Sequence, residues 1–97
     1  MAIGVVATLV VQAGKEKEFE DVFGALREQV LANEDGCEMY DLYKSKADAS
    51  TYVVMERYKD EAALKAHGQS AHFKAAGPKL GGVLGGAPVI DYLDPVA

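Results

Sequence analysis

The residues of this sequence best suited to acid–base chemistry are two histidines and one glutamate. His67 and His72 are the only histidines, and an imidazole can exchange a proton near neutral pH. Glu56 lies inside the apolar stretch 52–58, where a carboxylate needs a partner or a function because burying its charge alone is costly. Arg57 alternates to the opposite face of this predicted strand, so His67 is the best candidate partner. The pair is either a base oriented by a carboxylate or a structural bond between helix and sheet.

The spacing of the two histidines argues against a metal site. Two zinc ligands on one helix are normally three or four residues apart. The five-residue separation of His67 and His72 places them roughly 140° apart around a continuous helix. Gly68 could bend the helix and Glu56 could add a carboxylate, but we expect no metal and no cofactor.

The tyrosines and the cysteine offer fewer chemical possibilities. The five tyrosines all fall on predicted strands: Tyr40, Tyr43, Tyr52, Tyr58 and Tyr92. Strand aromatics mostly fill cores and interfaces, although one or two of these hydroxyls could point into a cavity. Cys37 is the only cysteine, which excludes an intrachain disulfide and fits a reducing, cytoplasmic compartment. No basic neighbour in the sequence lowers its pKa, so we expect an inert thiol.

Composition excludes two classes of partner. The formal net charge is −5, with the acidic residues spread along the 97-residue chain. Nucleic acids and anionic membranes both require concentrated Lys and Arg, so neither is an expected partner. The N-terminal apolar run 3–11 has no basic region before it and is too short to cross a bilayer, so we expect no signal peptide or anchor. The length predicts a single domain, 1–97.

The pattern of apolar residues predicts the elements that must position these side chains. Four strands are expected at 3–11, 37–45, 51–58 and 87–93, and Pro88 indicates that the last is an edge strand or that Pro88 only opens it. One amphipathic helix should begin at Lys15 and end near Gly36, which is free to take a left-handed conformation. A second helix should follow Asp60, be interrupted at Gly68 and resume after Ser70, and Gly77-Pro78 with the glycines at 81, 82, 85 and 86 should end the helical region.

This order, β-α-β-β-α-β, is the split βαβ arrangement of an α+β ferredoxin-like fold with an antiparallel four-stranded sheet. Both helices then lie on one face of the sheet, and the other face is bare. A soluble monomer does not tolerate a bare apolar sheet face. We therefore expect a homodimer in which two such faces meet and form a dimeric α/β barrel.

The segment 35–73 resembles the antibiotic biosynthesis monooxygenase family. The matching positions are Gly36-Cys37, Tyr40, Leu42, Tyr52-Val53, Glu56, Asp60, Ala63-Leu64 and the run Ala66-His67-Gly68-Gln69-Ser70-Ala71-His72-Phe73. The start of the first helix, 14–19, also resembles that of the family, and the nearest subgroup is the small quinol-monooxygenase-like proteins. The resemblance implies a dimeric α/β barrel with a cavity in each subunit between sheet and helices.

The resemblance also implies a reaction: oxidation of a small electron-rich phenol or quinol by O2, without metal or flavin. In that reaction His67, oriented by Glu56, would deprotonate the substrate. His72, Ser70 and Tyr40 would hold the developing oxyanion, and Phe73 and Tyr52 would contact the substrate.

Some positions depart from the family pattern, and two other functions stay open. Gly68 replaces a bulkier apolar residue, Asp35 replaces proline, and the absence of tryptophan disfavours haem degradation. One alternative is an oxygen-independent isomerase, which would need Lys44, Arg57 or Lys74 in the pocket for a phosphorylated substrate. The other is a non-catalytic binding dimer whose cavity is filled by side chains.

Overall fold

The computed structural model describes residues 1–97 and contains four strands and three helices. In chain order they are β1 (Ile3–Val10), α1 (Glu16–Asn33), β2 (Cys37–Lys44), β3 (Thr51–Tyr58), α2 (Glu61–Gln69), α3 (Ala71–Gly81) and β4 (Val89–Leu93). The strand bounds lie within two residues of those expected, and α1 ends three residues before Gly36. None of the helices is both long and apolar enough to span a membrane.

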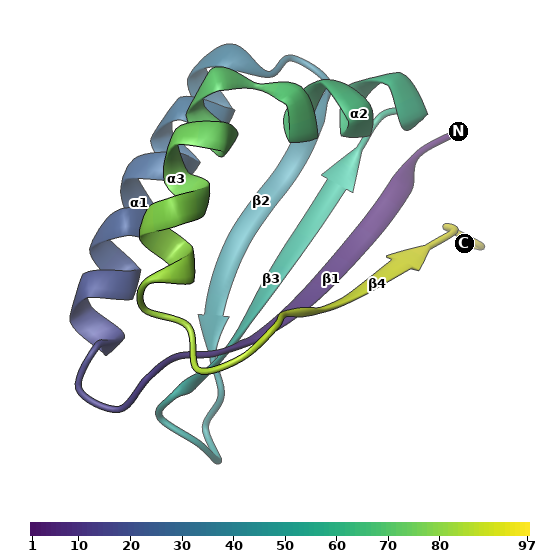
Figure 1. Cartoon of the computed structure of the whole chain (residues 1–97). Coiled ribbons are helices and arrows are strands. Elements are labelled where there is room, and N and C mark those ends of the chain that lie inside the picture. The colour runs from purple at the N-terminus through teal and green to yellow at the C-terminus, as the bar shows by residue number, and fades with distance from the viewer.

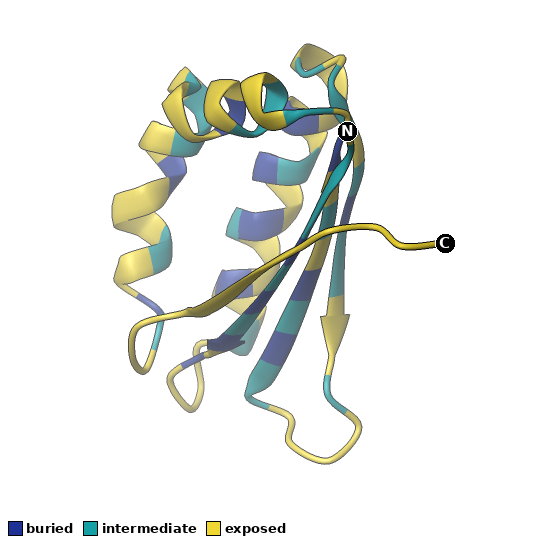
Figure 2. Cartoon of the chain, turned by 90° about the vertical axis from the view of Figure 1, so that its right-hand side faces the viewer, coloured by how far each residue is buried: buried dark blue, intermediate teal, exposed yellow.

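The sheet has the predicted ferredoxin-like topology. Its strand order is β2-β3-β1-β4, and every neighbouring pair is antiparallel. All three helices cover one face of the sheet, and the opposite face carries no helix (Figures 1 and 2). As Pro88 indicated, β4 is an edge strand.

The strand register sets up one transverse row of residues on the covered face. Tyr40 of β2 pairs with Glu56 of β3, Glu56 pairs with Val5 of β1, and Val5 pairs with Tyr92 of β4. Adjacent strands bring directly paired side chains to within about 5 Å of each other. Tyr40 and Glu56, 16 residues apart in sequence, are therefore neighbours facing the helices.

The hydrophobic core fills the space between the sheet and the helices. Alternate residues of the strands point into it, as the two-residue period of a strand requires, and α1 adds its apolar stripe. The core residues are Ala7, Leu9, Val11, Phe19, Phe23, Leu26, Val30, Tyr40, Tyr52, Val54, Ala76 and Val83. This packing fixes α1 along the sheet and holds its C-terminal end beside α2 and α3 (Figure 1).

The second helical region differs from its prediction in one respect. It is two separate helices, so the chain reads βαββααβ, and Ser70 is the extended residue between them, with φ −67° and ψ 149°. The second of these helices contains Gly77 and Pro78 and ends at Gly81, one of the glycines expected to end the helical region. Pro78 has no N–H, so it donates no helical bond back to Lys74, a loss that a helix near its end can accommodate.

Gly36 has a different role from the one expected. Gly14, with φ 87°, is the only residue in the left-handed region, so Gly36 does not end α1 by that conformation. Gly36 is instead needed for close approach, since a Cβ there would lie 2.5 Å from the Cβ of Ala63 in α2. The turn that follows α1 can therefore lie directly against α2.

Candidate active site

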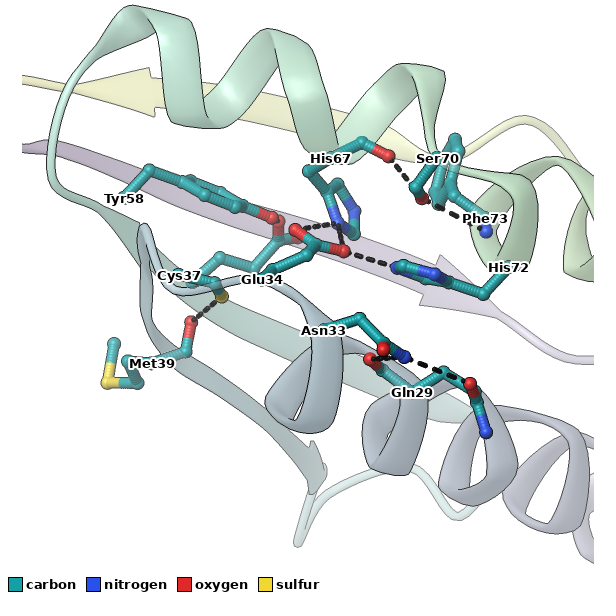
Figure 3. A network of polar contacts seen from close by, with 11 residues as sticks. Gln29, Asn33, Glu34, Cys37, Met39, Tyr58, His67, Ser70, His72 and Phe73 are labelled. Carbon is teal, nitrogen blue, oxygen red and sulfur yellow. Dashed lines mark hydrogen bonds and ion pairs between the residues drawn. The ribbon is translucent and has the colours of Figure 1, made fainter.

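Three side chains meet where α1 ends, α2 ends and α3 begins. Glu34 follows the last turn of α1, His67 is in the last turn of α2, and His72 is in the first turn of α3. The His67 Nδ1 atom lies 3.0 Å from both carboxylate oxygens of Glu34, and the His72 Nε2 atom lies 2.5 Å from Glu34 Oε2. Figure 3 shows the Glu34 carboxylate between the two imidazole rings.

The break between α2 and α3 allows this convergence. A separation of roughly 140° between His67 and His72 holds only on a continuous helix, and the helix is broken at Ser70, so that expectation is wrong. The Ser70 hydroxyl accepts a hydrogen bond from the Phe73 N–H and donates one to the His67 carbonyl oxygen, which caps both helices at the break. The change in helix direction turns both histidines toward Glu34.

The His67 ring is held by three aromatic rings. The ring centroids of Tyr40, Tyr58 and Phe73 lie 5.2, 5.4 and 4.8 Å from that of His67, and all three rings are tilted against it. Such tilted pairs are favourable contacts. His67 is therefore packed on its faces, bonded through Nδ1, and only 5% exposed.

These contacts determine which nitrogen of His67 is available for chemistry. A carboxylate can only accept hydrogen bonds, so Glu34 requires the proton of neutral His67 to be on Nδ1. The Nε2 atom then carries a lone pair, and it has no hydrogen-bond partner in the protein. Because every fully buried polar side-chain atom has a partner, Nε2 keeps some exposure, and His67 is one of the residues that line a cavity.

That cavity lies between the sheet and the helices and has a volume of about 550 Å³. Its walls are mainly apolar and include residues from all four strands and all three helices. They comprise Val5, Ala7, Leu9, Phe19, Phe23, Tyr40, Val54, Glu56, Leu64, His67, Gly68, Phe73, Gly77, Leu80, Gly81, Leu84, Pro88, Ile90 and Tyr92. An apolar pocket of this size with a few polar groups is typical of small-molecule sites.

Glu56 faces this cavity, but its hydrogen-bond partner is not His67. Its Oε1 atom accepts a hydrogen bond of 2.5 Å from the Tyr58 hydroxyl, and His67 pairs with Glu34 instead. The expected Glu56–His67 bond is therefore wrong, because the turn after α1 places a closer carboxylate against the ring. Burial raises the pKa of the Glu56 carboxyl, an effect that the Tyr58 hydrogen bond and the charge of His67 only partly oppose.

Tyr40 contributes a hydroxyl to the same cavity. Its ring stacks on Phe23 with a centroid distance of 5.3 Å and an interplanar angle of 5°, and the residue is 3% exposed. The hydroxyl makes no hydrogen bond within the protein and is not fully buried, and Tyr40 is one of the residues that line the cavity. Burial and the nearby Glu56 charge raise the pKa of Tyr40, which keeps this hydroxyl protonated as a donor.

Three of the predicted site residues lie elsewhere. Tyr52 packs on Phe19 and donates its hydroxyl to Glu20, so it does not line the cavity. The Ser70 hydroxyl is fully used as a helix cap. His72 lies on the far side of Glu34 and lines a groove between α1 and α3 instead. Phe73, like Tyr40, does line the cavity.

Glu34 is the residue of the candidate site that sequence reasoning missed, since it was interpreted only as part of the helix end. One signal was available. An acidic residue at a helix C-terminus is disfavoured by the helix dipole, so Glu34 needed a compensating partner. The two histidines supply it, and no Lys or Arg pairs with Glu34.

Comparison with known proteins yields one family. The family described as "Antibiotic biosynthesis monooxygenase" matches residues 2–79 of this chain. That range contains every residue of the Glu34–His67–His72 cluster, together with Tyr40, Glu56 and Phe73.

Individual relatives agree with this match. The protein named "Putative monooxygenase YcnE" of Bacillus subtilis (strain 168) is 37% identical over 68 residues, which are 70% of each chain. A crystal structure described as a "putative antibiotic biosynthesis monooxygenase" from Caulobacter crescentus CB15 is 52% identical. It aligns with a TM-score of 0.96 over 99% of this chain and 91% of its own. A conserved protein from Methanosarcina mazei Go1 is 33% identical, with a TM-score of 0.91 over 96% of this chain and 91% of its own.

Proposed function

Because the chain belongs to the antibiotic biosynthesis monooxygenase family, we propose that it is a cofactor-independent monooxygenase of small electron-rich phenols or quinols. The observation that carries the proposal is His67, a residue of the cavity wall whose Nδ1 is held by Glu34 while its Nε2 has no partner in the protein. Family membership supports the reaction class, and the site supports the mechanism by which this chain would perform it.

In the first step the substrate hydroxyl binds at His67. The Nε2 lone pair takes the hydroxyl proton, and the Glu34 carboxylate stabilises the imidazolium that forms. The phenolate left in the cavity is rich in electrons and is shielded from water by apolar walls. The protein thus makes the substrate its own reductant for oxygen.

The oxygen step then balances without an added reductant. The phenolate gives electrons to O2, and a ring carbon that bears hydrogen forms a C–O bond to it. The resulting peroxide takes the proton from His67. Loss of the ring C–H proton to the base and cleavage of the O–O bond leave one oxygen on the ring as a carbonyl. The other oxygen departs as water, so that phenol plus O2 becomes quinone plus H2O.

Two further groups fit roles in this sequence. The free hydroxyl of Tyr40 can donate a hydrogen bond to the substrate oxygen beside His67, since both residues line the same cavity. The raised pKa of Glu56 suits a carboxyl that shares a proton with the peroxide or with a second substrate hydroxyl.

The cavity gives no support to a phosphorylated substrate. Its lining includes no lysine or arginine. Lys44 pairs with Glu20 beside Tyr52, and Arg57 pairs with Glu38 on the opposite side of the sheet. An oxygen-independent isomerase of a sugar phosphate therefore lacks the cations it would need. A binding dimer with a side-chain-filled cavity is likewise unsupported.

A second copy of the chain is the proposed partner for the sheet face that carries no helix. Exposed apolar side chains on this face include Val10, Tyr43, Met55, Val89 and Leu93. They come from all four strands, and a two-fold pairing of two such faces would cover them all. Covering this face would also stiffen β4, whose residues are all exposed in the single chain.

Product labelling tests the proposal. The metal-stripped protein would be incubated with a panel of phenols and quinols under ¹⁸O2, and the products analysed by mass spectrometry. The account expects one ¹⁸O atom in the product ring and the other in water, without added flavin, metal or reductant. Products that carry oxygen from water, or turnover that persists without O2, would contradict it.

A further inference from the structure

The cluster at the junction of the three helices has the composition of a metal site. We propose that Glu34, His67 and His72 bind one divalent transition-metal ion, best matched by Zn²⁺, and that this ion inhibits the base in the cavity. The metal-binding half of the inference stands on the cluster alone. The inhibitory half rests on the proposed function.

The geometry already brings the three ligand atoms together. The His67 Nδ1 atom, the His72 Nε2 atom and a Glu34 oxygen all lie within 4.8 Å of one another. Tetrahedral zinc, with bonds of about 2.0–2.1 Å, spaces its ligand atoms roughly 3.3 Å apart, so ångström-scale side-chain rotations are enough. Two histidines and one glutamate are also a recognised zinc ligand set that leaves one position for water.

The surroundings of the cluster favour a cation. Glu34 is paired with no Lys or Arg, and its only partners are the two imidazoles. A divalent ion would offset the charge of the Glu34 carboxylate, which no Lys or Arg balances.

A route for the metal is also present. The side chain of His72 is 16% exposed, whereas that of Glu34 is 9% exposed and that of His67 is 6% exposed. His72 and Asn33 line the groove between α1 and α3, which opens on the outer surface rather than on the substrate cavity. A metal ion and its water ligand can thus enter from the groove without passing a bound substrate.

Occupation of the site would change the tautomer of His67. Without metal, the proton of neutral His67 is on Nδ1 and Nε2 is free. A metal bound at Nδ1 needs that lone pair, so the proton of the neutral ring must move to Nε2. The atom that faces the cavity then becomes a donor and can no longer accept a proton from the substrate. Zinc binding and base catalysis are therefore mutually exclusive.

Calorimetric titration of the metal-stripped protein with ZnCl2 tests the metal site. The wild type should bind one Zn²⁺ per chain, and Mg²⁺, which prefers oxygen ligands, should not bind. Glu34→Gln and His72→Gln should each weaken zinc binding by about 100-fold or more. Asp35→Asn, which removes an exposed acid next to the cluster, should bind like the wild type. Wild-type affinity in the Glu34→Gln variant would overturn the site.

Nitrogen NMR of the histidine rings tests the inference without any substitution. In the metal-free wild type, His67 should show a protonated Nδ1 and a bare Nε2, and one equivalent of Zn²⁺ should reverse this pattern. If zinc binds but the protonation pattern of the His67 ring stays the same, the ion binds elsewhere. If zinc binds as expected but the metal-free protein shows no oxygenase activity, the proposed function fails and the metal site stands.

Discussion

The imidazole of His67 lies between the Glu34 carboxylate and the cavity, with Nδ1 3.0 Å from both carboxylate oxygens and Nε2 left without a partner. This arrangement joins an orienting acid to a base even though the two residues are 33 positions apart and on different helices. The carboxylate that orients the ring thus comes from the end of a helix rather than from the sheet.

Gly36 allows that arrangement, so its replacement should destabilise the fold. In Gly36→Ala the new Cβ would meet Ala63 Cβ at 2.5 Å, and we expect a loss of about 1–3 kcal/mol in the free energy of unfolding, measured by urea denaturation. Gly68→Ala is the matched control, because its Cβ meets nothing and lies inside α2. The control should be more stable by roughly 0.5–1 kcal/mol. Equal stability of Gly36→Ala and wild type would refute the close approach.

The buried carboxyl of Glu56 should make stability depend on pH in a defined direction. Burial raises its folded-state pKa above that of the unfolded chain, so the folded state binds this proton more tightly. The stability from this group is present below the unfolded pKa, near 4.5, and is lost as pH rises through the raised folded value. In thermal melts, the melting temperature of Glu56→Gln should therefore rise relative to that of the wild type as pH increases from 4 to 8. A wild type whose melting temperature rises relative to that of Glu56→Gln over this range would contradict the prediction.

Cys37 should react slowly in the folded protein. Burial, with the charges of Glu34 and Glu56, raises the pKa of its thiol to about 11. At pH 8 only about one thiol in a thousand would then be ionised, against roughly a quarter for a free cysteine. Alkylation by iodoacetamide should be at least ~100-fold slower than in urea-unfolded protein. If folded and unfolded protein were alkylated at similar rates, the Cys37 thiol would be neither buried nor hindered from ionising.

The bare face of the sheet should mediate self-association. Light scattering should give twice the 10.3 kDa mass of one chain. Met55→Glu, which puts a charge at the centre of that face, should yield monomer. Leu31→Glu is the control, because Leu31 is exposed on α1, away from the sheet. Dimerisation that survives Met55→Glu but is lost in Leu31→Glu would show that a different surface associates.

The sequence predicts the elements well because their signals are local. The apolar stripe of α1 and the valine- and tyrosine-rich strands specify the sheet, its topology and its covered face. The site was harder, because it depends on how three helix ends meet. Ser70 was recognised as a cap, but the change of direction that it allows, and hence the convergence of His67 and His72, has no local signal. The partner of Glu56 was also missed, since Tyr58, two residues away on the same strand face, was considered only as core.

Oxygen uptake tests the central claim most directly. An oxygen electrode would compare four metal-stripped proteins: the wild type, Glu34→Gln, His67→Ala and Asp35→Asn. The substrate would be a phenol or quinol that the wild type oxidises, and heat-denatured protein would give the rate of spontaneous oxidation to subtract. If His67, held by Glu34, is the base, His67→Ala should lower kcat by about 10²–10⁴-fold. Glu34→Gln should also lower kcat, and Asp35→Asn should have the kcat of the wild type. Undiminished uptake in both His67→Ala and Glu34→Gln, with both variants folded, would contradict the account.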